Sequence, residues 1–291
     1  MKAKHEHKER KQRPNGLIYK ILLAVCVIGF FAFGGMYVRN RMLEKQAQEL
    51  YEELLAQQAE SEVQEEPAAE AEPEPEEIPE PVDPLAVLGI QVPEKELEWE
   101  MLAEENEDIY AWIHIPNTNV DYPILQHPTD DNYYLDRNLD GSKGYPGCIY
   151  TQSLNDKDFT DPHTVLYGHN MKDGSMFANL HKFEDNLFFE ENPYIFVYTP
   201  DKTYAYEIFA AYEFSDAHLL YAYDFSDQES FEEFIKDVKN VRTMTSHIKD
   251  KWVGAEDKII TLSTCIGNKP NKRYLVSAVL VNGEDEHGTI Q

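Results

Sequence analysis

Cysteine is scarce in this chain of 291 residues, and its placement excludes a domain held together by disulfides. Only Cys26, Cys148 and Cys265 occur, and Cys26 lies within an apolar run, which leaves two for the remainder. Two cysteines cannot form a framework of several bridges. Neither a Cys-x-x-Cys pair nor a His-x-x-x-His cluster is present, which argues against a structural zinc site. We expect neither a metal nor a cofactor.

Positive charge is also scarce, except at the start of the chain. The formal net charge is −28, although residues 1–43 carry nine Lys and Arg against two Glu. The rest of the chain is therefore strongly acidic. A domain of this sign repels the phosphates of nucleic acids and the headgroups of anionic lipids. We expect no nucleic-acid partner.

Long apolar runs are few, and the one that stands out covers residues 17–38 with Lys20 as its only charge. A helix of this length is roughly 33 Å long, enough to cross a bilayer. The more basic flank, residues 1–16, predicts a cytoplasmic N-terminus and a folded part outside the cell. A cleaved signal peptide is the alternative, but the run is long and no small-x-small cleavage site follows it. The sequence predicts a single-pass membrane anchor.

Residues 39–93 have the composition of a stalk. Residues 42–66 are rich in Ala, Glu, Gln and Leu, which favour a helix. Residues 67–84 contain six prolines and seven acidic residues, a composition typical of an extended, self-repelling spacer. A stalk here would hold a domain away from the membrane.

The folded domain is predicted at 94–291 and is mainly β. Residues 94–112 have helical spacing of apolar side chains, and two further helices are predicted at 176–183 and 226–248, the latter capped by Ser226 or Asp227. Between them lie short runs rich in Ile, Val, Tyr and Thr, separated by turn residues, which indicate an antiparallel barrel or sandwich. The predicted strands cover 113–115, 120–124, 147–150, 164–167, 195–199, 203–214, 258–263 and 274–282.

One cysteine lies where a nucleophile is exposed yet rigidly held. Cys265 ends the β-branched run IITLSTC, and Arg273 opens the next predicted strand eight residues later. If the two strands are neighbours joined by a loop at 266–272, thiol and guanidinium point into one cleft. Ser263, two residues before Cys265, faces the same way.

His169 is the candidate proton partner of Cys265. It follows the predicted strand 164–167 in the phrase LYGHN, where Gly168 lets the backbone turn. A Cys–His pair needs only proximity in the fold, so their separation in sequence is no objection. Taken singly, each residue has a plainer interpretation: a buried cysteine, as we read Cys148, a structural histidine, and a solvated arginine.

Three phrases in the same order resemble the sortase family. They are LYGHN with His169, TLSTC with Cys265, and the following Arg273. The segments 109–126, 131–138 and 168–180 resemble class B members in particular, as does a long helix before the TLSTC strand. The resemblance covers about 97–282. The short gap between Cys265 and Arg273 departs from the family pattern and indicates a trimmed loop.

This resemblance implies an eight-stranded sortase β-barrel with an N-terminal helix, and a cysteine transpeptidase of Gram-positive bacteria that anchors surface proteins to the cell wall. Such enzymes cut a C-terminal sorting motif after Thr, of the NPxTx or SPxTG kind in class B. They transfer the acyl group to an amine of a peptidoglycan precursor or a pilin. The implied roles are nucleophile for Cys265, proton partner for His169 and oxyanion clamp for Arg273. Leu135 and Tyr221 resemble residues that line the substrate groove.

Three alternatives stay open. A membrane-tethered cysteine peptidase would release the same thioacyl intermediate to water, and a non-catalytic surface module would keep the fold alone. A peptidoglycan L,D-transpeptidase would use a cysteine after a glycine, as in Gly147-Cys148, with a histidine upstream such as His127.

Overall fold

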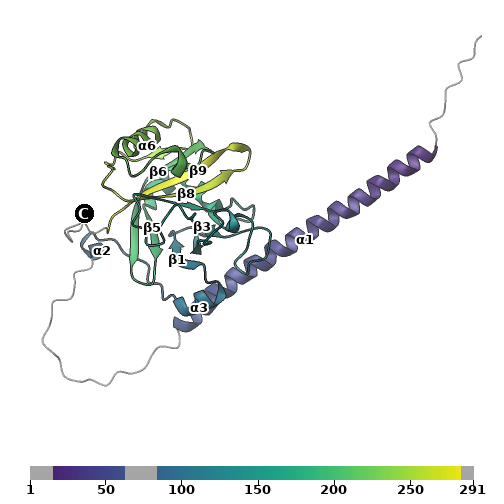
Figure 1. Ribbon diagram of the computed structural model, residues 1–291, viewed down its shortest axis with the longest axis horizontal. Coiled ribbons are helices and arrows are strands. Elements are labelled where there is room, and N and C mark those ends of the chain that lie inside the picture. The colour runs from purple at the N-terminus through teal and green to yellow at the C-terminus, as the bar shows by residue number, and fades with distance from the viewer. Residues whose placement is uncertain (1–15, 63–83, 283–291) are drawn as a thin grey trace, which may run out of the picture. The chain divides into compact units, whose positions relative to one another are not determined.

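The computed structural model describes residues 16–62 and 84–282 (Figure 1). The chain divides into two compact units, Met1–Lys45 and Gln46–Gln291. Helix α1, Gly16–Glu62, begins in the first unit and ends in the second. A search of the described residues for a helix that combines the length and apolarity needed to cross a bilayer finds none, so the anchor at 17–38 stays a prediction.

The second unit contains part of the segment that we assigned to the stalk. Ala47, Tyr51 and Leu54 of α1 are buried in it, and the Tyr51 hydroxyl donates a hydrogen bond to the Gly147 carbonyl at 3.2 Å. Helix α2, Pro84–Val87, likewise contributes the buried Leu85. Packing therefore begins near Gln46. The predicted spacer lies outside the described residues, apart from Pro84, and so do residues 1–15.

Eight strands close into a barrel, as predicted. Their order is β5-β1-β2-β3-β4-β8-β9-β6, and the pairing of β5 with β6 closes the ring, while β7 adds to the outer edge of β6. The sheet is not purely antiparallel, since β2 pairs with β3 and β4 with β8 in parallel. The strands are β1 Ile109–His114, β2 Asp121–Leu125, β3 Ile149–Tyr150, β4 His163–Tyr167, β5 Tyr194–Tyr198, β6 Thr203–Ser215, β7 His247–Ile248, β8 Ile259–Ile266 and β9 Lys269–Leu280.

The helix predicted at 94–112 is confirmed only over its middle part and is wrong at both ends. Helix α3 covers only Trp99–Glu105, and Asn106 ends it in an extended conformation. Residues from Ile109 form β1, which pairs with β2 on one side and β5 on the other. The apolar side chains on two sides of this segment are compatible with either a helix or a buried strand. Pairing with strands distant in sequence stabilises the strand.

The helix predicted at 226–248 is shorter than expected. Helix α6 covers Gln228–Asn240, and its N-terminus is capped by Asp227, whose side chain accepts a hydrogen bond from the Ser230 N–H. Residues 241–246 contain Val, two Thr and Ser, which are weaker helix formers than Ala or Leu, and the chain then pairs with β6 as β7. The remaining helices are 3₁₀ helices η1, Tyr133–Leu135, and η2, Phe177–Glu184, with α4, Asn186–Glu191, and α5, Leu219–Ala222.

Two apolar clusters hold the strands β4, β8 and β9 in place. The larger fills the barrel, and the smaller lies between α6 and the outer face of strands including β6 and β9 (Figure 1). Phe231, Phe234 and Val238 of α6 are fully buried in the smaller cluster. Strand β8 therefore has neighbouring strands on both edges and apolar layers on both faces, so its end is rigidly held.

Candidate active site

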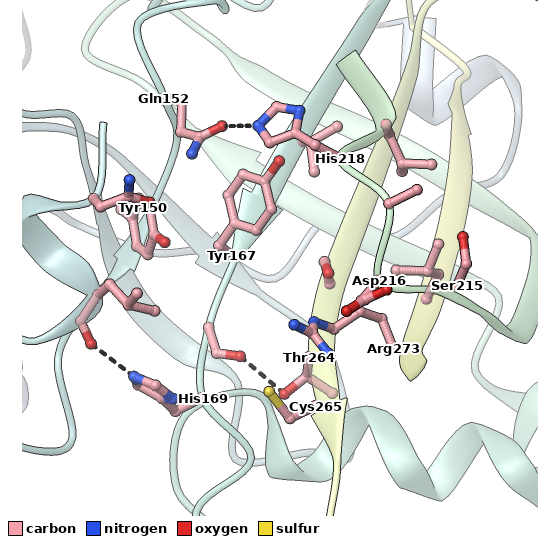
Figure 2. A pocket seen from close by; sticks show the side chains of 18 residues that line it. Tyr150, Gln152, Tyr167, His169, Ser215, Asp216, His218, Thr264, Cys265 and Arg273 are labelled. Atoms are coloured by element: carbon pink, nitrogen blue, oxygen red, sulfur yellow. Dashed lines mark hydrogen bonds between the residues drawn. The ribbon is translucent and has the colours of Figure 1, made fainter. Parts of the chain in front are cut away.

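A cleft opens at the ends of β4, β8 and β9 (Figure 2). Its walls come from these strands, from η1 and from the segment 215–219 that follows β6. Cys265, His169 and Arg273 all line it, so the structure brings together the three predicted catalytic residues.

Cys265 and Arg273 are direct partners across the hairpin formed by β8 and β9. Residues opposite one another in an antiparallel pair project to the same face, with Cβ atoms about 4.5–5.5 Å apart. Figure 2 shows the Cys265 sulfur and the Arg273 guanidinium on the same side of the hairpin. The expected loop at 266–272 is smaller still, because only Gly267 and Asn268 separate the two strands. Cys265 is exposed, as a nucleophile must be.

His169 reaches Cys265 through the parallel pairing of β4 with β8. Tyr167 is aligned with Ser263 at the end of this pairing, and His169 and Cys265, each two residues further on, both line the cleft. The Gly168 N–H donates to the Ser263 carbonyl at 3.2 Å, and the Thr264 hydroxyl donates to the Gly168 carbonyl at 2.8 Å. A Cβ on residue 168 would come within 2.5 Å of Ile149, which explains the glycine before the histidine.

One nitrogen of the His169 ring is committed to a structural contact. Its Nε2 lies 2.7 Å from the Leu135 carbonyl, which can only accept a hydrogen bond. Nε2 therefore carries a proton in this contact, which leaves Nδ1 as the ring nitrogen that could exchange a proton. The Tyr145 ring meets the imidazole edge-on, with centroids 5.0 Å apart. Leu135 thus orients the base with its backbone, a role that a sequence pattern of side chains does not reveal.

Backbone contacts orient the Arg273 guanidinium. Its Nη1 donates to the carbonyls of Pro270 at 3.1 Å and Lys272 at 3.0 Å. A guanidinium has five N–H donors, so others are left to bind an oxyanion formed beside Cys265.

Cys148 has the character of a core residue. It is 1% exposed, and its Sγ contacts the Arg137 carbonyl at 3.4 Å. Burial raises the pKa of the Cys148 thiol to about 12. A thiol that stays protonated and out of solvent is unreactive, so Gly147-Cys148 does not provide the nucleophile of an L,D-transpeptidase.

The predicted substrate-binding residues divide into two groups. Ser263 and Leu135 line the cleft, whereas Tyr221 lies outside its lining, 71% exposed, with its ring 4.4 Å from that of His218. His218 itself lines the cleft and contacts the Gln152 side chain at 2.5 Å (Figure 2). No motif surrounds His218 or Gln152, so the sequence did not single them out. Within the ranges 16–62 and 84–282, no group of His, Cys, Asp or Glu is arranged to hold a metal ion.

Comparison with known proteins identifies the family. The Sortase domain family matches residues 113–281. Sortase B of Listeria monocytogenes is 40% identical over 184 residues, which are 63% of this chain and 72% of that protein. Sortase B of Staphylococcus aureus is 28% identical over 188 residues, 63% of this chain and 75% of that one. The X-ray structure of Clostridium perfringens sortase B superposes with a TM-score of 0.57 at 30% identity, over 63% of this chain and 100% of that chain. The chain therefore belongs to the sortase family, and the relatives that it resembles are class B sortases.

Proposed function

We propose that this sortase is a cysteine transpeptidase in which Cys265 is the nucleophile, His169 the proton carrier and Arg273 the oxyanion clamp. The observation that carries the proposal is the direct pairing of Cys265 with Arg273 across β8 and β9. The parallel neighbour β4 adds His169 to the same cleft.

The reaction follows from these positions. The Cys265 thiolate attacks the carbonyl carbon of Thr in the sorting motif, and the carbonyl oxygen becomes an oxyanion that Arg273 binds. When the peptide bond breaks, protonated His169 gives its Nδ1 proton to the departing amine. A thioester remains. An incoming amine loses a proton to His169, attacks the thioester carbon and releases the Cys265 thiolate.

We propose a substrate of the sorting-motif class, NPxTx or SPxTG, on a surface protein, and an acceptor amine on a peptidoglycan precursor or a pilin. A solved structure of Staphylococcus aureus sortase B, at 28% identity and a TM-score of 0.55, is a complex with substrate. In this chain the cleft that contains Cys265 is also lined by Ser263 and Leu135, which supports the proposal that a peptide bound there contacts them.

We further propose that the chain is anchored in the cell membrane with its catalytic domain outside. The proposal rests on the apolar run 17–38 and on the basic residues that flank it. Protease added to intact cells should digest the catalytic domain, and in untreated cells the chain should stay in the membrane fraction after a carbonate wash. Full release by that wash would contradict an anchor.

Mass spectrometry tests the reaction. The unit Gln46–Gln291, which lacks Cys26, is incubated with peptides of both motifs and a short amine acceptor. We expect a thioacyl adduct on Cys265 and a peptide joined to the amine. Both products should be lost in Cys265→Ala and kept in the matched control Cys148→Ala. Hydrolysis at every amine concentration would instead favour a peptidase, and unchanged products in Cys265→Ala would refute the assignment.

A further inference from the structure

A second histidine contacts the backbone carbonyl of Cys265. His181, in η2, has its Nε2 3.1 Å from the Cys265 carbonyl. The side-chain amide of Asn170 donates to the same carbonyl at 2.9 Å and lies 3.0 Å from His181 Nε2. These three polar groups form a triangle around the peptide that carries the thiol.

Glu184 and Tyr274 contact the His181 ring on its other sides. Its Nδ1 lies 2.5 Å from the Glu184 carboxylate, and the buried Tyr274 stacks on it with centroids 5.0 Å apart and planes at 26°. Tyr274 follows Arg273 in β9. Because successive residues of a strand face opposite sides, the Tyr274 side faces away from the cleft lined by Arg273. His181 is not among the residues that line the cleft.

The hydrogen bonds of this triangle hold the Cys265 carbonyl in either protonation state of His181. The short contact to Glu184 requires a proton on Nδ1. If the ring is neutral, Nε2 accepts one Asn170 amide hydrogen while the other is donated to the Cys265 carbonyl. If the ring is charged, Nε2–H and Asn170 both donate to that carbonyl. Either arrangement needs a polar group at the Nε2 position.

We propose that His181 is a positioning residue for the nucleophile: together with Asn170 it fixes the end of β8, and so directs the Cys265 thiol toward His169 and Arg273. The proposal rests on the proposed transpeptidase function. Asn170 belongs to the phrase LYGHN that carries the family resemblance, whereas His181 lies outside the segments named for it and contacts the strand from η2.

Two substitutions distinguish the contacts of His181 Nε2 from the contact of its Nδ1. In His181→Gln the side-chain amide takes the place of Nε2 and keeps a polar contact with Cys265 and Asn170. In His181→Asn the amide takes the place of Nδ1 and keeps only the Glu184 contact. We expect Asn to lower kcat about 10-fold with KM unchanged within about 2-fold, because the residue does not touch substrate. Gln should retain kcat within about 3-fold.

His114→Gln is the matched control. Its side chain is 21% exposed and lies 3.5 Å from the Asp121 carboxylate, much as His181 is 23% exposed beside Glu184. It belongs to β1 and lines no part of the cleft. We expect His114→Gln to keep the kcat of the parent chain.

The experiment measures transpeptidation by the full-length chain, its thermal midpoint, and the rate at which iodoacetamide alkylates Cys265. Alkylation needs no peptide, so it tests His181 even if no sorting motif reacts; absent transpeptidation in the parent would count against the proposed function alone. A slower alkylation in His181→Asn than in His181→Gln supports the positioning role. Equal rates in the two variants, whether both normal or both reduced, would overturn it. If the Asn variant does not fold, Glu184→Ala, at a side chain 35% exposed, replaces it, and parent-like alkylation there would overturn the proposal.

Discussion

The hydroxyl of Thr264 links β8, the strand of Cys265, to the loop that carries His169. It donates a hydrogen bond of 2.8 Å to the carbonyl of Gly168, the residue before His169. Thr264 is 2% exposed, and Gly168 is half-buried in the wall of the cleft. The substitution Thr264→Val keeps the shape of the side chain and removes only the donor.

Two effects should follow. The lost hydrogen bond costs about 0.5–1.5 kcal/mol of the free energy of unfolding, and in a domain of this size that lowers Tm by roughly 1–6 °C. The loop that carries His169 also loses an anchor to β8. Because a displacement of about 1 Å in a catalytic group can reduce the rate about 100-fold, we expect kcat to fall at least about 10-fold.

Thr261→Val is the matched control. Thr261 lies in the same strand, is fully buried, and bonds through its hydroxyl to Ser277 and His163, each at 2.8 Å. Its loss should lower Tm to a similar extent without changing kcat. Calorimetry measures Tm and a transpeptidation assay measures kcat for both variants. Equal kcat values in the two variants would refute the link between Thr264 and the position of His169.

Three further outcomes are expected. Burial lowers the pKa of His163 to about 3, below the value of about 6.5 in an unfolded chain. The unfolded state therefore binds the extra proton, and stability falls as pH drops from 6.5 toward 3. In urea unfolding, His163→Gln should reduce the loss between pH 7 and pH 4 by roughly 3 kcal/mol; an unchanged loss would contradict this. Arg273→Lys should lower kcat about 100-fold, because lysine lacks the planar set of donors. The control Arg242→Lys changes an exposed side chain outside the lining of the cleft and should leave kcat unchanged. Equal kcat values in the two variants would exclude Arg273 as the oxyanion clamp. A chain that begins at Leu85 lacks the buried Tyr51 and its neighbours in α1, and should be less stable to urea than Gln46–Gln291 by about 2–4 kcal/mol; coincident unfolding curves would show that α1 does not support the barrel.

Local sequence patterns sufficed for much of the fold, and the resemblance to sortases pointed to the candidate catalytic residues. Short β-branched runs between turn residues have few alternatives to strands, so most barrel strands were placed to within a few residues. Cys265 and Arg273 could be expected in one cleft because they flank a single turn, but their direct pairing depends on an irregularity in register between Cys265 and Ile266 that the spacing did not predict. The LYGHN and TLSTC phrases placed His169 in the same site.

Contacts between distant segments decided the rest. The segment from Ile109 forms β1 because β2 and β5 pair with it. Residues from Gln46 belong to the folded unit because Tyr51 packs and hydrogen-bonds against the barrel. The parallel alignment of β4 with β8 brought His169 to Cys265, and the carbonyl of Leu135 then selected which ring nitrogen is free. The contact between His181 and the Cys265 carbonyl arises in the same way. Backbone carbonyls are identical at every residue, so a hydrogen bond to one of them leaves no trace in sequence and exists only once the chain has folded.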